Sequence, residues 1–266
     1  MPTAFLARPP VALAFALLLG AGLAPALAQP PFKHCPACPL MVALPAGTVT
    51  YAPGGQAGQQ VQTQAIVPFA ISRTEVTRAQ WRAVMGHYPK SKPFCVQPAC
   101  PAETLSWLDA QAYTVRLSQR TGHTYRLPTE AEWVYAARGQ AGYSTAAKAT
   151  ADNTLREAAA QLGRQAWFAG NSGGVVHPVA GKLPNGFGLH DMLGNVWEWT
   201  QGCYLAEAGS NSAPDCSLRM VRGGAFDSRG PAEANAEFAL ALPMATRNQL
   251  FTGLRVVLAL PPANHK

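Results

Sequence analysis

Glycine and proline interrupt this chain so often that long regular elements are not expected over most of its length. The 266 residues include 24 glycines and 23 prolines, about 18% of the chain against a usual share of roughly 12%. Both residue types punctuate helices and strands. No internal repeat is visible, which argues against a solenoid or a propeller. The sequence therefore predicts a loop-rich fold rather than a helical bundle or a series of βαβ units.

The first 28 residues have the features of a secretory signal peptide. Arg8 gives a positive start, Val11–Leu19 is an apolar core too short to span a bilayer, and Ala26–Ala28 has the small residues of a cleavage site. We expect residues 1–28 to be removed and residues 29–266 to form one domain. The mature protein is then exported, either periplasmic or secreted. No later segment is apolar for long enough to form a transmembrane helix.

The number and the pattern of charged residues argue against nucleic acid as a partner. The formal net charge is +7, and only 13% of the residues are charged. No run of lysines and arginines alternates with aromatic residues, so we do not expect the protein to bind nucleic acid.

All six cysteines follow the predicted signal peptide. An even number of cysteines in an exported chain indicates three disulfides, and six cysteines allow 15 connectivities. Pairing of sequence neighbours is attractive because each pair would close a loop that contains proline or glycine. One of these pairs has the C-x-x-C spacing of a redox site, but the βαβ surroundings of such a site are missing, which favours a structural disulfide. The candidates are Cys35, Cys38, Cys95, Cys100, Cys203 and Cys216.

Helices are predicted mainly from their N-terminal caps. Three capping patterns occur, in which Ser or Thr is followed three residues later by Gln, Asp or Glu: Thr77 with Gln80, Ser106 with Asp109, and Thr129 with Glu132. The second of these helices carries Leu108, Ala112 and Val115 on one face. A further helix is expected near residues 154–162.

Strands are predicted at both ends of the mature chain. Alternating apolar residues in Val42–Tyr51 and Val61–Ile71 indicate an antiparallel entry to the fold. Arg219–Arg222 and Leu254–Leu258 are typical of closing strands.

One carboxylate occupies an unusually apolar place in the sequence. Glu198 lies between Trp197 and Trp199, where an unpaired charge is costly. Asp191 precedes it by seven residues, and Gly194 permits a sharp turn between the two. Two carboxylates together with carbonyls of irregular backbone provide the oxygen ligands that calcium prefers. The alternative, which the residue types by themselves favour, is that both carboxylates bind only arginines or backbone N–H groups.

Several segments follow one another in the order found in one known family. They are Glu75–Trp81, Leu105–Ala110, Arg126–Trp133, Ala136–Gly139, Asn185–Trp199, Arg222–Gly224 and Gly253–Arg255. With these motifs the chain resembles the formylglycine-generating enzyme (sulfatase-modifying factor) family over roughly residues 40–260. The resemblance implies an α+β fold: a single mixed domain with little regular secondary structure, related to C-type lectins.

The resemblance also implies a structural calcium ion. Carried over position by position, its ligands are the side chains of Asp191 and Glu198 and the carbonyl oxygens of Gly194 and Val196. Asp191 stands where some members have asparagine, which is also an oxygen ligand. The resemblance thus moves our expectation from the arginine alternative to calcium. A second calcium of some members has no ligands that we can align to residues 140–184.

The same resemblance argues against copper. Formylglycine-generating members oxidise a substrate cysteine with O₂ and copper(I), which two cysteines with C-x₄-C spacing hold after a Gly-Gly-Ser motif; soft thiolates select Cu(I). Here the two cysteine positions are Ser228 and Glu233, and Ala225 replaces the serine. Cys95 and Cys100 have the same spacing, but they precede the second helix and are expected to form a disulfide. Copper-dependent oxidation is therefore not expected, and whether the protein is an enzyme stays open.

These observations lead to two hypotheses about function. In the first, the protein is an accessory or maturation factor that binds a peptide or a small molecule in a cleft near Arg222–Ser228. In the alternative, it is an oxidoreductase of the same family with a divergent active site, which acts in periplasmic maturation of, for example, a siderophore or a sulfatase. The candidate catalytic residues of the alternative are Asp227, Ser228, Arg229 and Arg247.

Overall fold

The computed structural model describes residues 29–55, 60–89, 92–139, 152–205, 213–245, 247 and 251–260. The predicted signal peptide lies outside these residues. Within the described part of the chain, no helix is long and apolar enough to cross a membrane.

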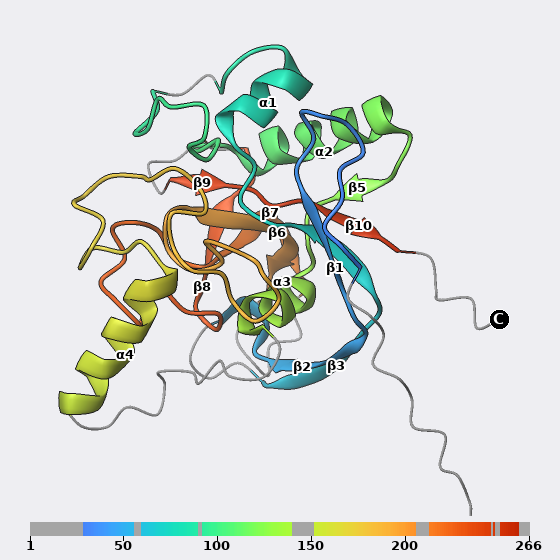
Figure 1. Ribbon diagram of the computed structural model, residues 1–266. Helices are drawn as coiled ribbons and strands as arrows, with labels where there is room; N and C mark the ends of the chain where they lie inside the picture. The colour runs from blue at the N-terminus through green and yellow to red at the C-terminus, as the bar shows by residue number, and fades with distance from the viewer. Residues whose placement is uncertain are drawn as a thin grey trace, which may run out of the picture.

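The helices are short and widely separated along the chain. They are α1 (Arg78–Met85), α2 (Trp107–Thr121), α3 (Glu130–Arg138), α4 (Asp152–Gln165) and a 3₁₀ helix (Pro53–Gly55). Figure 1 shows α1 and α2 together on one side of the molecule, α3 near its centre and α4 at the periphery. The helix predicted near residues 154–162 is confirmed as part of α4.

In the part of the chain that the structure describes, ten strands form three small sheets. The strands are β1 (Met41–Leu44), β2 (Gly47–Tyr51), β3 (Gln62–Ile66), β4 (Phe69–Ser72), β5 (Tyr125–Arg126), β6 (Trp197–Tyr204), β7 (Asp215–Arg222), β8 (Ala239–Pro243), β9 (Thr252–Gly253) and β10 (Val257–Ala259). The sheets have the orders β1-β4-β10-β5, β2-β3 and β8-β7-β6-β9. The predicted antiparallel entry is confirmed, because β1 pairs with β4 and β2 pairs with β3. The two predicted closing strands correspond to β7 and β10. They belong to different sheets.

The three predicted N-terminal caps are all present. In α1, for example, the Gln80 N–H donates to Thr77 Oγ1 at 3.2 Å, and the Thr77 N–H donates to Gln80 Oε1 at 2.9 Å. Equivalent reciprocal bonds open α2 and α3. Each pair satisfies backbone N–H groups that a helix start leaves without partners. Gly86 and Gly122, at φ angles of 83° and 73°, end α1 and α2 in the left-handed region.

The apolar face that the sequence indicates for α2 is not the buried face. Leu108 and Val115 are 46% and 55% exposed. The helix buries a different set of side chains, namely Trp107, Ala110, Tyr113, Thr114 and Leu117. Tyr113 stacks on Trp81 of α1 with ring centroids 5.3 Å apart. Both faces have helical periodicity, and the face that enters the core is the one that packs against α1.

The cysteines pair with their sequence neighbours. The disulfides are Cys35–Cys38, Cys95–Cys100 and Cys203–Cys216. The last one links β6 to β7 within one sheet. The local connectivity is therefore confirmed among the fifteen that the sequence allows. Short strands, few helices and long connections also confirm the predicted α+β class.

Candidate functional site

The loop before β6 and the loop after β7, both in the sheet β8-β7-β6-β9, are hydrogen-bonded to each other. The Gly194 N–H of the loop before β6 donates to the Gly223 carbonyl oxygen of the loop after β7, at 2.9 Å. In return, the Phe226 N–H donates to the Asn195 carbonyl oxygen at 2.9 Å. The segment that is expected to bind calcium is thus hydrogen-bonded to the loop that contains Ser228 and Glu233, the two positions that the resemblance aligns with copper-binding cysteines.

The loop before β6 has an irregular backbone. Asp191, Gly194 and Asn195 have φ angles of 54°, 72° and 57°, in the left-handed region that L-residues rarely adopt. A Cβ atom at Gly194 would lie 2.0 Å from the Trp167 carbonyl oxygen. Only glycine fits this close approach of two backbone segments.

Glu198 is neutralised by an arginine. Its carboxylate accepts from Arg255 Nε at 3.0 and 3.1 Å and from Trp133 Nε1 at 2.7 Å, and Arg255 Nη2 lies 2.9 Å from Oε1. The two charged side chains are 1% and 0% exposed. The guanidinium also donates to the carbonyl oxygens of Ser72 and His190. Glu198 therefore has an arginine partner, as the alternative expects, but it is not bound only to arginine or backbone N–H groups, because the Trp133 side chain also donates to it.

Asp191 is satisfied only in part. Its Oδ2 accepts the Ala180 N–H at 2.6 Å, whereas its buried Oδ1 has no hydrogen-bond partner among the described residues. Burial raises the pKa of Asp191. A buried carboxylate oxygen without a partner costs free energy, which a bound cation would recover.

A third carboxylate, which sequence reasoning missed, lies beside these two. Glu75 is fully buried and accepts from Asn195 Nδ2 at 2.9 Å and from the Val196 N–H at 3.2 Å. Burial, followed by the negative charges of Asp191 and Glu198, raises the pKa of Glu75 well above its ordinary value. One guanidinium thus faces three carboxylates. The sequence signal was the acidic first residue of the Glu75–Trp81 motif.

The residues around Asp191 supply part of the donor set that a calcium ion needs. Asp191 offers a free carboxylate oxygen, and the surplus of negative charge favours a cation. No group of three His, Cys, Asp or Glu side chains converges on a common metal position in the described ranges. A cation bound to Asp191 would therefore need backbone carbonyls as further ligands, which calcium accepts.

Ser228 and Glu233, which the resemblance aligns with the copper-binding cysteines, form hydrogen bonds within the loop after β7. Ser228 is buried, and its Oγ accepts the Ala225 N–H at 2.9 Å. Glu233 Oε2 accepts the Arg229 N–H at 2.8 Å. Burial, together with the negative charge of Glu233, raises the pKa of Asp227. Both replaced positions therefore bind the backbone of their own loop.

The four candidate catalytic residues do not form one cluster. Asp227, Ser228 and Arg229 share a single turn, in which the Arg229 side chain is 90% exposed. Arg247 instead pairs with Asp109 in the first turn of α2, with N–O distances of 2.6 and 2.7 Å.

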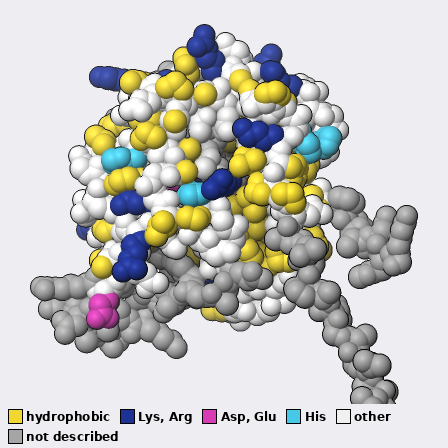
Figure 2. Space-filling view, in the orientation of Figure 1, with side chains coloured by type: hydrophobic (Ala, Val, Ile, Leu, Met, Phe, Trp, Pro, Cys, Tyr) yellow, Lys and Arg dark blue, Asp and Glu magenta, His cyan; other side chains and the backbone are white. Residues whose placement is uncertain are grey.

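Aromatic side chains border the loop after β7. Phe251 packs edge-on against Phe94, with ring centroids 4.4 Å apart, and in a tilted arrangement against Phe226, at 4.6 Å. Phe226 is buried, Phe251 is half-buried and Phe94 is 53% exposed. The three residues are far apart in the sequence, so no local pattern predicts this cluster, which we call the phenylalanine cluster. On the face drawn in Figure 2, lysines and arginines are scattered rather than gathered into one patch.

Comparison with known proteins agrees with the predicted resemblance. Residues 28–260 match the family of the sulfatase-modifying factor enzyme 1-like domain. The formylglycine-generating enzyme of Thermomonospora curvata is 34% identical over 176 residues, which are 61% of this chain and 55% of that protein. The inactive Cα-formylglycine-generating enzyme 2 of Bos taurus is 33% identical over 165 residues, 55% of this chain and 49% of that protein. The chain thus spans about half the length of these relatives.

A solved structure extends the likeness to the whole fold. PvdO from Pseudomonas aeruginosa superposes with a TM-score of 0.65 at 28% identity, covering 88% of this chain and all of that one. The family match, the order of the motifs and the shared fold agree with one another. The chain belongs to the family of the sulfatase-modifying factor enzyme 1-like domain.

Proposed function

We propose that this protein is an exported accessory or maturation factor that binds a peptide or a small molecule beside the loop after β7, without copper-dependent cysteine oxidation. The observation that carries the proposal is the bonding of Ser228 and Glu233 to the backbone of that loop. A hydroxyl and a carboxylate are poor ligands for Cu(I), which prefers soft sulfur. A relative that is named inactive is compatible with this function.

The phenylalanine cluster supports ligand binding at this loop. Phe94 is more than half exposed, although it is large and apolar, and it rests on two further aromatic rings. Exposed aromatic side chains on a rigid base commonly anchor ligands, because they offer a large contact area at a small entropic cost. We therefore place the ligand against Phe94 and Phe251.

The alternative function is an oxidoreductase with a divergent active site. Asp227 is the residue that favours it, because burial raises the pKa of this carboxyl group and brings it nearer to the range of a general acid. Formylglycine-generating enzymes among the relatives are compatible with this alternative. Its substrate would be a periplasmic maturation target such as a siderophore or a sulfatase.

We also propose that calcium stabilises the loop before β6, with Asp191, Glu198 and the carbonyls of Gly194 and Val196 as ligands. The unpartnered Asp191 Oδ1 and the excess of buried carboxylates support this proposal. When bound, calcium would offset negative charge and fix the irregular backbone. Copper has no comparable donors at the loop after β7.

One experiment tests both parts of the proposed function. The purified protein is supplied with Cu(I), O₂ and a cysteine-containing peptide from a sulfatase, and aldehyde formation is followed by mass spectrometry. We expect the peptide cysteine to stay unmodified. Binding to the phenylalanine cluster is measured with the fluorescent apolar probe anilinonaphthalene sulfonate, for which Phe94→Ser should reduce the fluorescence enhancement severalfold.

Val115→Ser is the matched control for the binding measurement. Val115 is an apolar side chain on α2 with 55% exposure, close to the 53% of Phe94, but it lies outside the phenylalanine cluster. Its substitution should leave probe fluorescence unchanged. Aldehyde on the peptide would contradict the absence of copper chemistry, and equal losses in the two variants would contradict the binding surface.

A further inference from the structure

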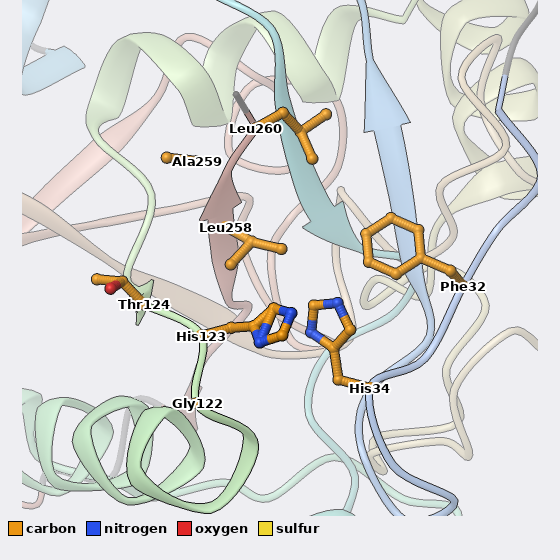
Figure 3. A pocket seen from close by; sticks show the side chains of 8 residues that line it. All are labelled: Phe32, His34, Gly122, His123, Thr124, Leu258, Ala259 and Leu260. Carbon is orange, nitrogen blue, oxygen red and sulfur yellow. The ribbon is translucent and has the colours of Figure 1, made fainter. Parts of the chain in front are cut away.

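A hollow lies beside the sheet β1-β4-β10-β5, next to the inner strand β10. Its volume is about 490 Å³, and it opens between the N-terminal segment, the α2–β5 connection and β10 (Figure 3). The lining residues are Phe32, His34, Gly122, His123, Thr124, Leu258, Ala259 and Leu260. Phe32 is held in place by reciprocal backbone hydrogen bonds with Met41. The hollow is therefore apolar except for two histidines and a threonine.

The two histidines come from distant parts of the chain and meet in this hollow. The ring centroids of His34 and His123 are 3.7 Å apart, with the ring planes tilted by 47° (Figure 3). His123 is exposed, and His34 is half-buried. Both rings therefore reach the solvent of the hollow.

The Nδ1 atom of each histidine is hydrogen-bonded to another residue of the protein. His123 Nδ1 lies 3.1 Å from the Thr121 carbonyl oxygen, and His34 Nδ1 lies 2.7 Å from the Tyr125 hydroxyl. Since a carbonyl only accepts, the proton of neutral His123 is on Nδ1 and the lone pair is on Nε2. In the described part of the chain, neither Nε2 atom takes part in a hydrogen bond.

This arrangement is the one found in histidines that bind metals. A ligating histidine typically donates its second ring N–H to a carbonyl or another oxygen, which fixes both the tautomer and the ring orientation. Imidazole nitrogen suits Zn²⁺ and Cu²⁺ rather than Ca²⁺, which prefers oxygen. The ring centroids are 3.7 Å apart, so both Nε2 atoms can come within about 2.0–2.1 Å of one ion only after the two rings rotate away from each other about their side-chain bonds.

We propose that His34 and His123 together bind a divalent transition-metal ion, of the class of Zn²⁺, through their Nε2 atoms. Tyr125 positions His34 and is not a ligand. Burial, followed by the proximity of His123, lowers the pKa of His34 and so keeps the ring neutral. Two protein ligands leave two positions of a tetrahedral ion open. These positions are available to water or to a donor atom of a small ligand in the hollow, which Phe32 and Leu258 also line.

This site is independent of the proposed function, since its ligands are nitrogen atoms in the N-terminal segment and the α2–β5 connection, away from the carboxylates of the loop before β6. Zn²⁺ binding is measured by isothermal titration of the untagged full chain with ZnCl₂. Excess CaCl₂ in the buffer keeps the proposed calcium site at Asp191 and Glu198 saturated. We expect one Zn²⁺ per protein with micromolar affinity. His34→Gln and His123→Gln should each weaken binding by about tenfold or more, and Tyr125→Phe by about tenfold through loss of the partner of Nδ1.

His87→Gln provides the matched control. His87 is exposed, and its Nδ1 also lies near a backbone carbonyl, that of Tyr88 at 2.8 Å, but it stands alone. We expect this variant to bind Zn²⁺ as the wild type does. The proposal is overturned if the wild type takes up no Zn²⁺, or if His34→Gln and His123→Gln, with unchanged near-ultraviolet circular dichroism, bind it as tightly as the wild type.

Discussion

At the scale of single residues, the buried ion pair between Glu198 and Arg255 dominates the centre of the molecule. Both side chains are excluded from solvent, and the guanidinium also satisfies the carbonyl oxygens of Ser72 and His190. An ion pair of this kind adds little net stability compared with apolar residues, but removal of one partner leaves an unpaired buried charge.

Arg255→Met should therefore lower the free energy of unfolding by about 3–5 kcal/mol. The loss arises because Glu198 then stays buried without its counter-charge. Urea denaturation in EGTA measures the loss, since the chelator prevents any added cation from replacing the guanidinium. Arg229→Met is the control: Arg229 is 90% exposed and 3.6 Å from Glu233, so its change should stay within about 0.5 kcal/mol. Equal losses in the two variants would refute this role for Arg255.

At the scale of elements, the N-terminal cap of a helix is set by residues close in sequence, whereas the face that the helix buries is set by the elements packed against it. The capping pairs of α1, α2 and α3 are fixed by residues three positions apart, and all three were predicted correctly. The buried face of α2 was predicted wrongly, because Leu108 and Val115 share a helical face just as Tyr113 and Leu117 do. Only the presence of α1 and β5 beside α2 selects between the two faces.

The loop before β6 is the element whose stability should depend on calcium. Chelation with EGTA should lower the melting temperature of the wild type, and added Ca²⁺ should restore it; an ion at 100 times its Kd contributes about 2.7 kcal/mol. Asp191→Gly should abolish this dependence, because it removes the free carboxylate oxygen while tolerating the φ of 54°. Scanning calorimetry with and without the chelator measures both effects.

Asp215→Gly controls for general effects of the chelator. Asp215 is exposed, and within the described ranges its side chain binds only Ser217, so this variant should respond to EGTA as the wild type does. A wild type that melts at the same temperature with and without EGTA would rule out the calcium ion.

At the scale of the whole molecule, three small sheets and loop-rich connections are joined by contacts between distant segments. Covalent links contribute to this assembly. Cys203–Cys216 closes a loop with a sequence separation of 13 residues, between the two central strands of one sheet. A disulfide that closes such a loop restricts the unfolded chain.

The double substitution Cys203→Ala with Cys216→Ala should lower the free energy of unfolding by about 3 kcal/mol, the value expected for a loop of roughly 15 residues. Urea denaturation under non-reducing conditions measures the change. The wild type treated with a reducing agent and alkylated should show at least the same loss, because all three disulfides are then open. A double variant as stable as the wild type would mean that this disulfide does not stabilise the fold.

The sequence by itself determined what depends on near neighbours and on the order of motifs: the helix caps, the loop-rich α+β class and the family. It made disulfides between sequence neighbours attractive, but only the structure selected that connectivity. Tertiary structure alone decided which distant groups meet. Glu198 finds Arg255 57 positions away, and the loop bordered by Phe226 receives Phe94 and Phe251 from other segments. The physical reason is that a capping bond is set by local backbone geometry, whereas a buried charge, an exposed aromatic ring or a free imidazole nitrogen takes its chemistry from whatever the completed fold places beside it.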